Sequence, residues 1–239
     1  KTPFLPMLES DEAGYAYLLF LRPRRMGKSL LASMLEHYYD LAREGQWEDL
    51  FRGLWIHEHP TPERSRYLAL ALDFSPVSTD GSAADMRRSF TNVVKNGIRP
   101  LLMRYRARFP DLARFEATLQ DYDDAADLIG ALISIVGGLD HKLYVIIDEY
   151  DNFANRLLSD GAQDVYEAIV QRTGFVRSFY AALKVGTQTG AVARLFITGV
   201  SPILLDDLSS GFNIVTNIST KADFNLLAGF SHADVTRAV

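Results

Sequence analysis

Residues 17–29 have the sequence Tyr-Leu-Leu-Phe-Leu-Arg-Pro-Arg-Arg-Met-Gly-Lys-Ser, and this stretch decides the fold. Its first five residues are apolar and predict a buried strand, whereas the pattern after Ser29 is helical. A short loop ending in Gly27-Lys28-Ser29 joins the two. In such a loop the backbone N–H groups and the positive helix end meet phosphate, the lysine reaches the outer phosphates, and the serine hydroxyl binds Mg²⁺. The stretch therefore predicts a phosphate-binding loop.

The loop departs from the usual pattern at one position. The motif G-x-x-x-x-G-K-[ST] places its first glycine at position 22, where this chain has Arg22. Together with Pro23, Arg24 and Arg25, this residue makes the loop stiffer and more cationic. We expect Arg24 or Arg25 to point its guanidinium at the phosphates or at a neighbouring subunit's nucleotide, the alternative being that both pack outward. Gly-Lys-Ser alone also occurs in surface turns, and its place between strand and helix favours nucleotide binding.

A second segment supports the first. The apolar run 143–147 predicts a buried parallel strand that ends in Asp148-Glu149. A carboxylate at this edge of a sheet can hold Mg²⁺ through water, and a second one beside it can orient or deprotonate an attacking water. A strand that ends in solvated acids is the alternative. With the phosphate-binding loop upstream, we expect Asp148 to bind metal and Glu149 to act in catalysis, as in a Walker B motif.

Strands alternate with helical patterns along the chain. Further strands are expected at Tyr67–Asp73, at 194–199 and, more weakly, at 212–220. Helices are expected from Ser29 onward, over 46–51, from Ser82 to about Phe109 with an interruption near Gly97 and Pro100, over 112–119, 124–136 and 163–184, and from Ser231. The first of these places on one face Leu30, Leu31, Met34, Leu35, Tyr38 and Leu41. The pattern predicts an α/β fold with a parallel, doubly wound sheet of about five strands and a helical insertion at about 82–139, between strands two and three.

The composition fits one globular domain over residues 1–239. Hydrophobic residues make up 48% of the chain, and this length can bury a full core. The longest uncharged apolar stretch, 128–139, is too short to span a bilayer, so we expect no membrane contact. The chain has no cysteine, which excludes disulfides and thiolate metal sites and fits a cytoplasmic location.

Polar residues follow two other strands. The C-terminal ends of parallel strands line one crevice, so Thr198 or Ser201 can sense a γ-phosphate. Capping of the next helix is the alternative for both hydroxyls. Asp73 ends the second strand, where it either supports the site or caps a turn.

Charge bears on nucleic-acid binding. The net charge of −5 and the pI of about 5.5 argue against a generally basic footprint. A local basic cluster precedes a run of acids, and two interpretations stay open: helix faces that neutralise each other, or a basic face for nucleic acid or a partner subunit. The basic residues are Arg87, Arg88, Lys95, Arg99, Arg104, Arg106 and Arg108, and the acids are Asp111, Glu116, Asp121, Asp123, Asp124 and Asp127.

These motifs together resemble the AAA-ATPase-like family, in which R-P-R-R-F-G-K-S replaces the glycine-rich loop. The resemblance is carried by residues 22–29, 72–75, 147–151, 179–184 and 196–201. It implies that Arg22 is the family's own form of the loop, and that Met26 replaces the usual phenylalanine. It also implies the additional-strand class of P-loop fold, with an extra strand between those of the Walker A and Walker B motifs, and Tyr67–Asp73 fits that strand.

The resemblance also concerns what adjoins this domain. Family members often continue into a C-terminal PD-(D/E)xK nuclease-like domain, which these 239 residues do not contain. The chain opens Lys1-Thr2-Pro3 without methionine, and it ends within a helical pattern at 237–239. We therefore expect a fragment of a longer protein with a further C-terminal domain.

We predict a domain that binds ATP and hydrolyses it with Mg²⁺. Catalytic roles are assigned to Lys28 and Glu149, and metal binding to Ser29 and Asp148. A regulatory switch with negligible hydrolysis is one alternative, and an ATPase module that serves an attached nuclease is another. Nucleic acid, through an attached domain, and a second copy of the chain are candidate partners beside ATP. The residues expected to contact the nucleotide are Arg22, Pro23, Arg24, Arg25, Met26, Gly27, Lys28, Ser29, Leu30 and Thr198.

Overall fold

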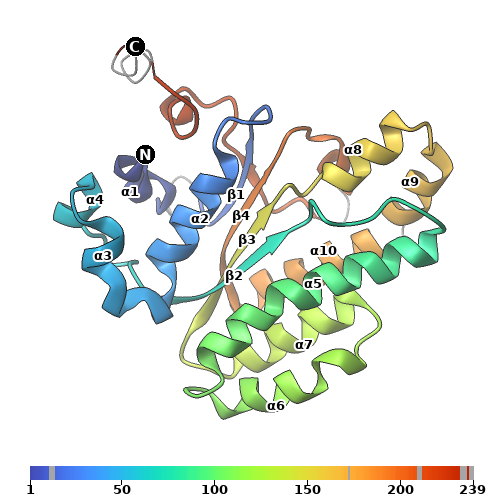
Figure 1. Ribbon diagram of the computed structural model, residues 1–239, viewed down its shortest axis with the longest axis horizontal. Helices are drawn as coiled ribbons and strands as arrows, with labels where there is room; N and C mark the ends of the chain where they lie inside the picture. The colour runs from blue at the N-terminus through green and yellow to red at the C-terminus, as the bar shows by residue number, and fades with distance from the viewer. Residues whose placement is uncertain (11–13, 172, 209–211, 232–235, 237–239) are drawn as a thin grey trace.

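Five parallel strands form one sheet through the middle of the molecule (Figure 1). The computed structural model describes residues 1–10, 14–171, 173–208, 212–231 and 236. The strands are β1 (Tyr17–Leu21), β2 (Tyr67–Asp73), β3 (Lys142–Asp148), β4 (Val192–Gly199) and β5 (Thr216–Asn217). The predicted α/β class with a parallel sheet of about five strands is confirmed, although β5 is much shorter than the expected 212–220.

The strand order is β2-β3-β4-β1-β5. β4 lies between β1 and β3, with Thr198 opposite Phe20 and Phe196 opposite Ile146. β2 is the edge strand beside β3. The prediction that Tyr67–Asp73 separates the two motif strands is therefore wrong, because β4 occupies that place. Helical crossovers allow a parallel strand to insert anywhere in a sheet, so the order along the chain did not reveal the order in space.

Helices cover both faces of the sheet (Figure 1). Among the described residues, with η for 3₁₀ helices, they are η1 (Thr2–Phe4), α1 (Leu5–Leu8), α2 (Lys28–Tyr39), η2 (Leu41–Gln46), α3 (Trp47–Phe51), α4 (Trp55–Glu58), α5 (Ala83–Tyr105), α6 (Pro110–Thr118), η3 (Leu119–Asp121), α7 (Ala125–Gly137), α8 (Asn152–Ser159), α9 (Gln163–Val170), α10 (Phe175–Gln188), α11 (Ile203–Asp207) and η4 (Ala222–Phe224). α2 packs on one face, and α5, α7 and α10 pack on the other. The sheet has a hydrophobic core on each face, and strand side chains alternate between them. Leu18 and Phe20 pack into the core on the side of α2, and Leu19 packs into the core on the opposite face.

The long helix α5 is continuous, so the predicted interruption near Gly97 and Pro100 is wrong. Its start is as predicted, because the Ser82 side chain accepts from Asp85 N and the Asp85 side chain accepts from Ser82 N in a capping box. Glycine at position 97 serves close packing: a Cβ there would lie 2.4 Å from Leu72 Cδ2 on β2. That α5 to α7 form an insertion stays a prediction.

Two other helix predictions need correction. The helix expected over 163–184 is two helices, α9 and α10, because Gly174 precedes α10 in an extended conformation with ψ 141°. α8 was not predicted at all. The helix expected from Ser231 falls on residues that lie mostly outside the described ones.

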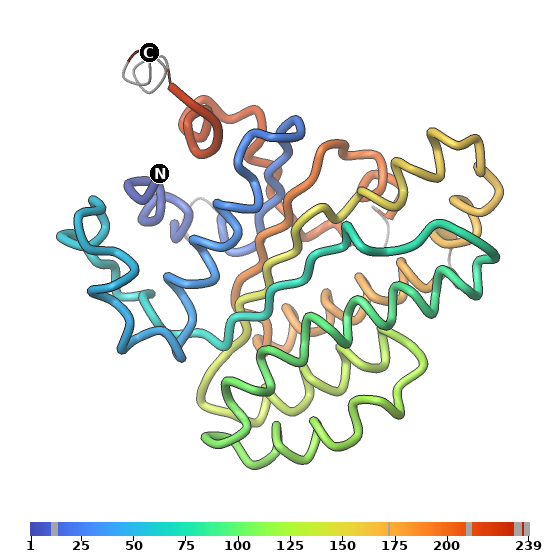
Figure 2. The backbone as a smooth tube through the Cα atoms, viewed as in Figure 1, coloured from blue at the N-terminus to red at the C-terminus, as the bar shows by residue number. Residues whose placement is uncertain are grey.

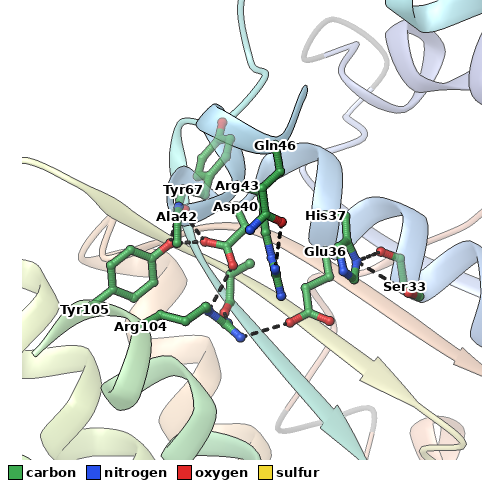
Figure 3. A network of polar contacts seen from close by, with 11 residues as sticks. Ser33, Glu36, His37, Asp40, Ala42, Arg43, Gln46, Tyr67, Arg104 and Tyr105 are labelled. Atoms are coloured by element: carbon green, nitrogen blue, oxygen red, sulfur yellow. Dashed lines mark hydrogen bonds and ion pairs between the residues drawn. The ribbon is translucent and has the colours of Figure 1, made fainter. Parts of the chain in front are cut away.

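A buried acid fixes the C-terminal end of α2 at the N-terminal edge of the sheet (Figure 3). Asp40 is fully buried, and Arg104 Nε lies 3.0 Å from its Oδ2. Tyr105 Oη and Ala42 N donate to Asp40 Oδ1. Burial raises the pKa of Asp40, and the Arg104 charge opposes this shift. Arg104 also pairs with Glu36, so it joins α5 to the last turns of α2.

Removal of the Asp40 carboxylate is expected to destabilise the fold. Asp40→Ala leaves Arg104 without its buried partner, and such a loss lowers the free energy of unfolding by about 3 kcal/mol. Asp111→Ala is the matched control, because Asp111 pairs with Arg114 at the surface, where a pair contributes about 0–1 kcal/mol. Urea unfolding measures both losses, and equal values would contradict the role assigned to Asp40.

Candidate active site

The loop between β1 and α2 lies at the C-terminal edge of the sheet. Gly27 precedes α2 in the left-handed conformation, with φ 82° and ψ 22°. Arg25 also has a positive φ, of 66°, whereas Arg22 is not among the described residues with positive φ. An arginine therefore fits position 22 without backbone strain, which explains how the loop forms without its first glycine.

The Arg22 side chain turns toward the C-terminal segment 219–224. Figure 2 shows the backbone of this segment passing beside the loop. Its guanidinium donates to Ser219 O at 2.6 Å and to Phe224 O at 3.2 Å. Leu21 N donates to Ser219 Oγ at 2.8 Å. The guanidinium also lies 4.5 Å from the centroid of the Phe20 ring. Arg22 thus ties this segment to the loop, and its expected contact with nucleotide stays a prediction.

The structure brings the two expected catalytic residues together. Lys28 Nζ lies 3.3 Å from Glu149 Oε1 and donates to Pro23 O at 3.4 Å. Lys28 is 3% exposed although it begins α2. Glu149 has φ 50°, a left-handed conformation that non-glycine residues rarely adopt. A buried lysine therefore meets a carboxylate held on a strained backbone, an arrangement typical of functional sites.

Ser29 and Asp148, the expected metal ligands, also lie near each other. The Ser29 side chain lies close enough to the Asp148 carboxylate to favour its charged form. Asp148 Oδ1 accepts Glu149 N at 3.0 Å. Burial raises the pKa of Asp148, and the charges of Glu149 and Asp73 raise it further.

Asp73 lies opposite Asp148 in the register of β2 and β3. Its carboxylate accepts Ser75 N at 2.8 Å and Ser75 Oγ at 2.9 Å. These bonds favour a turn cap, one of the two roles expected for Asp73.

Thr198 and Ser201 differ in their surroundings. Thr198 is fully buried on β4, and its Oγ1 has no hydrogen-bond partner in the described structure. A buried hydroxyl without a partner is rare and calls for an explanation, such as a ligand. Ser201 Oγ instead accepts Ile203 N at 3.3 Å, next to the start of α11. The capping alternative therefore suits Ser201, whereas the expected phosphate contact of Thr198 stays a prediction.

The remaining residues of the expected nucleotide contact are more exposed. Arg24 and Arg25 are exposed, and Arg24 lines an open cleft of about 450 Å³ beside α8 and α11. Met26 lies close to Gly229, because a Cβ added at position 229 would be 2.7 Å from Met26 Cε. Whether either arginine meets phosphate stays a prediction.

Leu30 is 76% exposed, so the expectation that it shares the apolar face of α2 is wrong. Leu31, Leu35 and Tyr38, spaced at helical intervals, form the buried stripe instead. The expected contact between Leu30 and nucleotide stays a prediction.

The basic cluster on α5 and after it is largely paired with acids. Arg87 Nη2 lies 2.8 Å from Asp124 Oδ2, and Arg106 Nη1 lies 3.1 Å from Glu116 Oε2. These contacts favour helix faces that neutralise each other. Nucleic acid as a partner, reached through an attached domain, stays a prediction.

Sequence reasoning gave Asp151 no role, although it lies in the quoted segment 147–151. The structure buries it completely, next to Glu149 and to the end of β4. The signal available in the sequence was a third acid two residues after Glu149.

Comparisons with known proteins show which family the chain belongs to. Among the described residues, no helix is both long and apolar enough to cross a membrane. No curated protein and no solved structure matches the chain significantly. A family model described as "Predicted AAA-ATPase" matches residues 1–209, most of the 239-residue chain. The protein therefore belongs to the AAA-ATPase-like family.

Proposed function

We propose that this protein binds ATP and hydrolyses it with Mg²⁺ at the C-terminal edge of β1, β3 and β4. The observation that carries the proposal is the ion pair of the buried Lys28 with the half-buried Glu149, 3.3 Å apart, beside the nearby Ser29 and Asp148. Family membership supports an ATPase in general. The position of β4 between β1 and β3 supports the additional-strand class of P-loop fold.

The residues present fit ATP and Mg²⁺. Ser29 and Asp148 offer a hydroxyl and a carboxylate, the oxygen ligands that Mg²⁺ prefers. Mg²⁺ commonly takes one or two carboxylates and completes its shell with phosphate and water, and when bound it neutralises charge on the phosphates. The unpartnered Thr198 hydroxyl, buried in the same edge, offers a donor for a phosphate oxygen.

The chain's own groups supply binding and proton transfer. Lys28 donates to the outer phosphates in place of its contact with Glu149, and the N-terminus of α2 adds backbone N–H groups. The Glu149 carboxylate, without Lys28 as partner, then accepts a proton from the attacking water or orients it. The left-handed backbone at Glu149 holds this carboxylate at the loop rather than in the solvent.

Asp148→Asn is expected to weaken Mg²⁺-dependent ATP binding about tenfold, because a neutral amide holds a divalent ion less well than a carboxylate. Calorimetry with ATP, with and without Mg²⁺, measures the difference. Asp111→Asn is the control, since Asp111 pairs with Arg114 at the surface, and its affinity should equal that of the wild type. Equal Mg²⁺ dependence in Asp148→Asn and wild type would contradict the metal assignment.

A switch that binds ATP with negligible hydrolysis is the second candidate. The contacts of Arg22 with segment 219–224 and of Met26 with Gly229 favour it, because they connect the loop to a distant part of the chain. Release of phosphate from ATP by the wild type, compared with Glu149→Gln, separates the candidates. Wild-type turnover no faster than that of the variant would favour the switch.

A further inference from the structure

Asp151 joins the loop after β3 to the loop after β4. Its carboxylate is fully buried. Asp151 Oδ2 accepts Ser201 N at 2.6 Å, Val200 N at 3.1 Å and Asn155 Nδ2 at 2.7 Å. Asp151 also precedes α8, yet its side chain makes no capping hydrogen bond to that helix. The carboxylate therefore serves the backbone of the loop after β4, and on its own helix it accepts from the side chain of Asn155.

Other contacts tighten the same junction. Tyr150 N donates to Thr198 O at 3.1 Å, and Tyr150 Oη donates to Ser201 O. Gly199 lies directly against Asp151, so a Cβ at position 199 would be 2.3 Å from Asp151 Oδ1. Only glycine permits this close approach. Residues 148–151 and 198–201 are therefore held in direct contact.

Glu149 lies inside this junction. Asp148 Oδ1 accepts its N–H on one side, and Tyr150 binds β4 on the other. The left-handed φ of 50° at Glu149 persists only where the surrounding contacts determine it. The same contacts fix the distance between the carboxylate of Glu149 and the buried hydroxyl of Thr198.

We propose that Asp151 is a positioning residue for the hydrolysis proposed above, on which this inference rests. By holding the loop after β4 against the loop after β3, Asp151 keeps Glu149 and Thr198 in the relative placement that hydrolysis requires. It does not touch the nucleotide. Its loss therefore lowers kcat far more than it weakens the binding of Mg·ATP.

The experiment compares Asp151→Asn and Asp151→Ala with wild type for kcat and for the Kd of Mg·ATP. Alanine removes all the acceptors, and a displaced catalytic group costs about 100-fold in kcat. Asparagine keeps one oxygen, so it should retain more activity than alanine. Asp40→Asn is the control for burial: Asp40 is equally buried at the opposite edge, and its kcat per folded molecule should match that of the wild type.

A double variant tests the connection to Glu149. Because Asp151 acts through Glu149, Asp151→Asn combined with Glu149→Gln should be no slower than Glu149→Gln alone. Additive losses, a wild-type kcat in Asp151→Asn, or a rise in Kd that matches the loss of kcat would each overturn the proposal. A wild-type protein that fails to hydrolyse ATP would overturn the proposed function and this inference together, whereas an active wild type with an equally active Asp151→Asn overturns this inference alone.

Discussion

Glu149→Gln is expected to lower ATP turnover by about 10²–10⁴, the usual contribution of a general base. Glutamine keeps the shape of the side chain and loses its charge and proton affinity, so water is no longer activated. ATP affinity should not weaken, because the contact that Glu149 makes in this structure is with Lys28 at 3.3 Å. Steady-state phosphate release and calorimetry measure the two quantities separately.

Glu36→Gln is the matched control for this change. Glu36 lies on the same helix as Lys28, pairs with Arg104 at 3.3 Å and has a side-chain exposure of 20%, close to the 18% of Glu149. It belongs to the opposite edge of the sheet, so its removal should leave kcat unchanged. A comparable fall in both variants would mean that loss of a buried charge, rather than loss of a base, explains the result.

The sequence predicted which candidate residues lie together better than it predicted their individual contacts. Lys28, Ser29, Asp148 and Glu149 were all expected at one edge of the sheet, because strand ends and turn residues are local features of the chain. The turn of Arg22 toward segment 219–224 was not foreseeable, since its partners are backbone carbonyls about 200 residues away. Backbone carbonyls exist at every position and leave no trace in the residue pattern.

The fold was likewise only partly predictable from the sequence. Apolar runs located β1 to β4, yet the place of β4 between β1 and β3 depends on long-range pairing that the chain order does not encode. Local breaks were also misjudged: Pro100 was expected to interrupt α5 and does not, because tertiary packing overrides propensity. The break within 163–184 was not expected either: α9 ends at Val170, and Gly174 is the N-cap of α10.

Lys28→Ala is expected to weaken Mg·ATP binding by about one to two decades. The change removes a charge-assisted contact with phosphate that contributes about 1.5–3 kcal/mol. It also leaves the Glu149 carboxylate without its cation, and this unpaired negative charge adds repulsion toward phosphate. Calorimetric titration of wild type and variant with Mg·ATP measures the loss.

Two further variants separate these contributions. Lys28→Ala combined with Glu149→Gln removes the repulsion, so its affinity should recover in part and remain below that of wild type. Lys95→Ala removes a lysine that is 7% exposed and donates to Gln120 O on the helical side of the molecule, and it should bind ATP as wild type does. If Lys28→Ala binds Mg·ATP as tightly as Lys95→Ala, the loop after β1 does not bind phosphate. A full recovery in the double variant would instead assign the whole loss to Glu149, because Lys28 would then contribute shielding and no contact of its own.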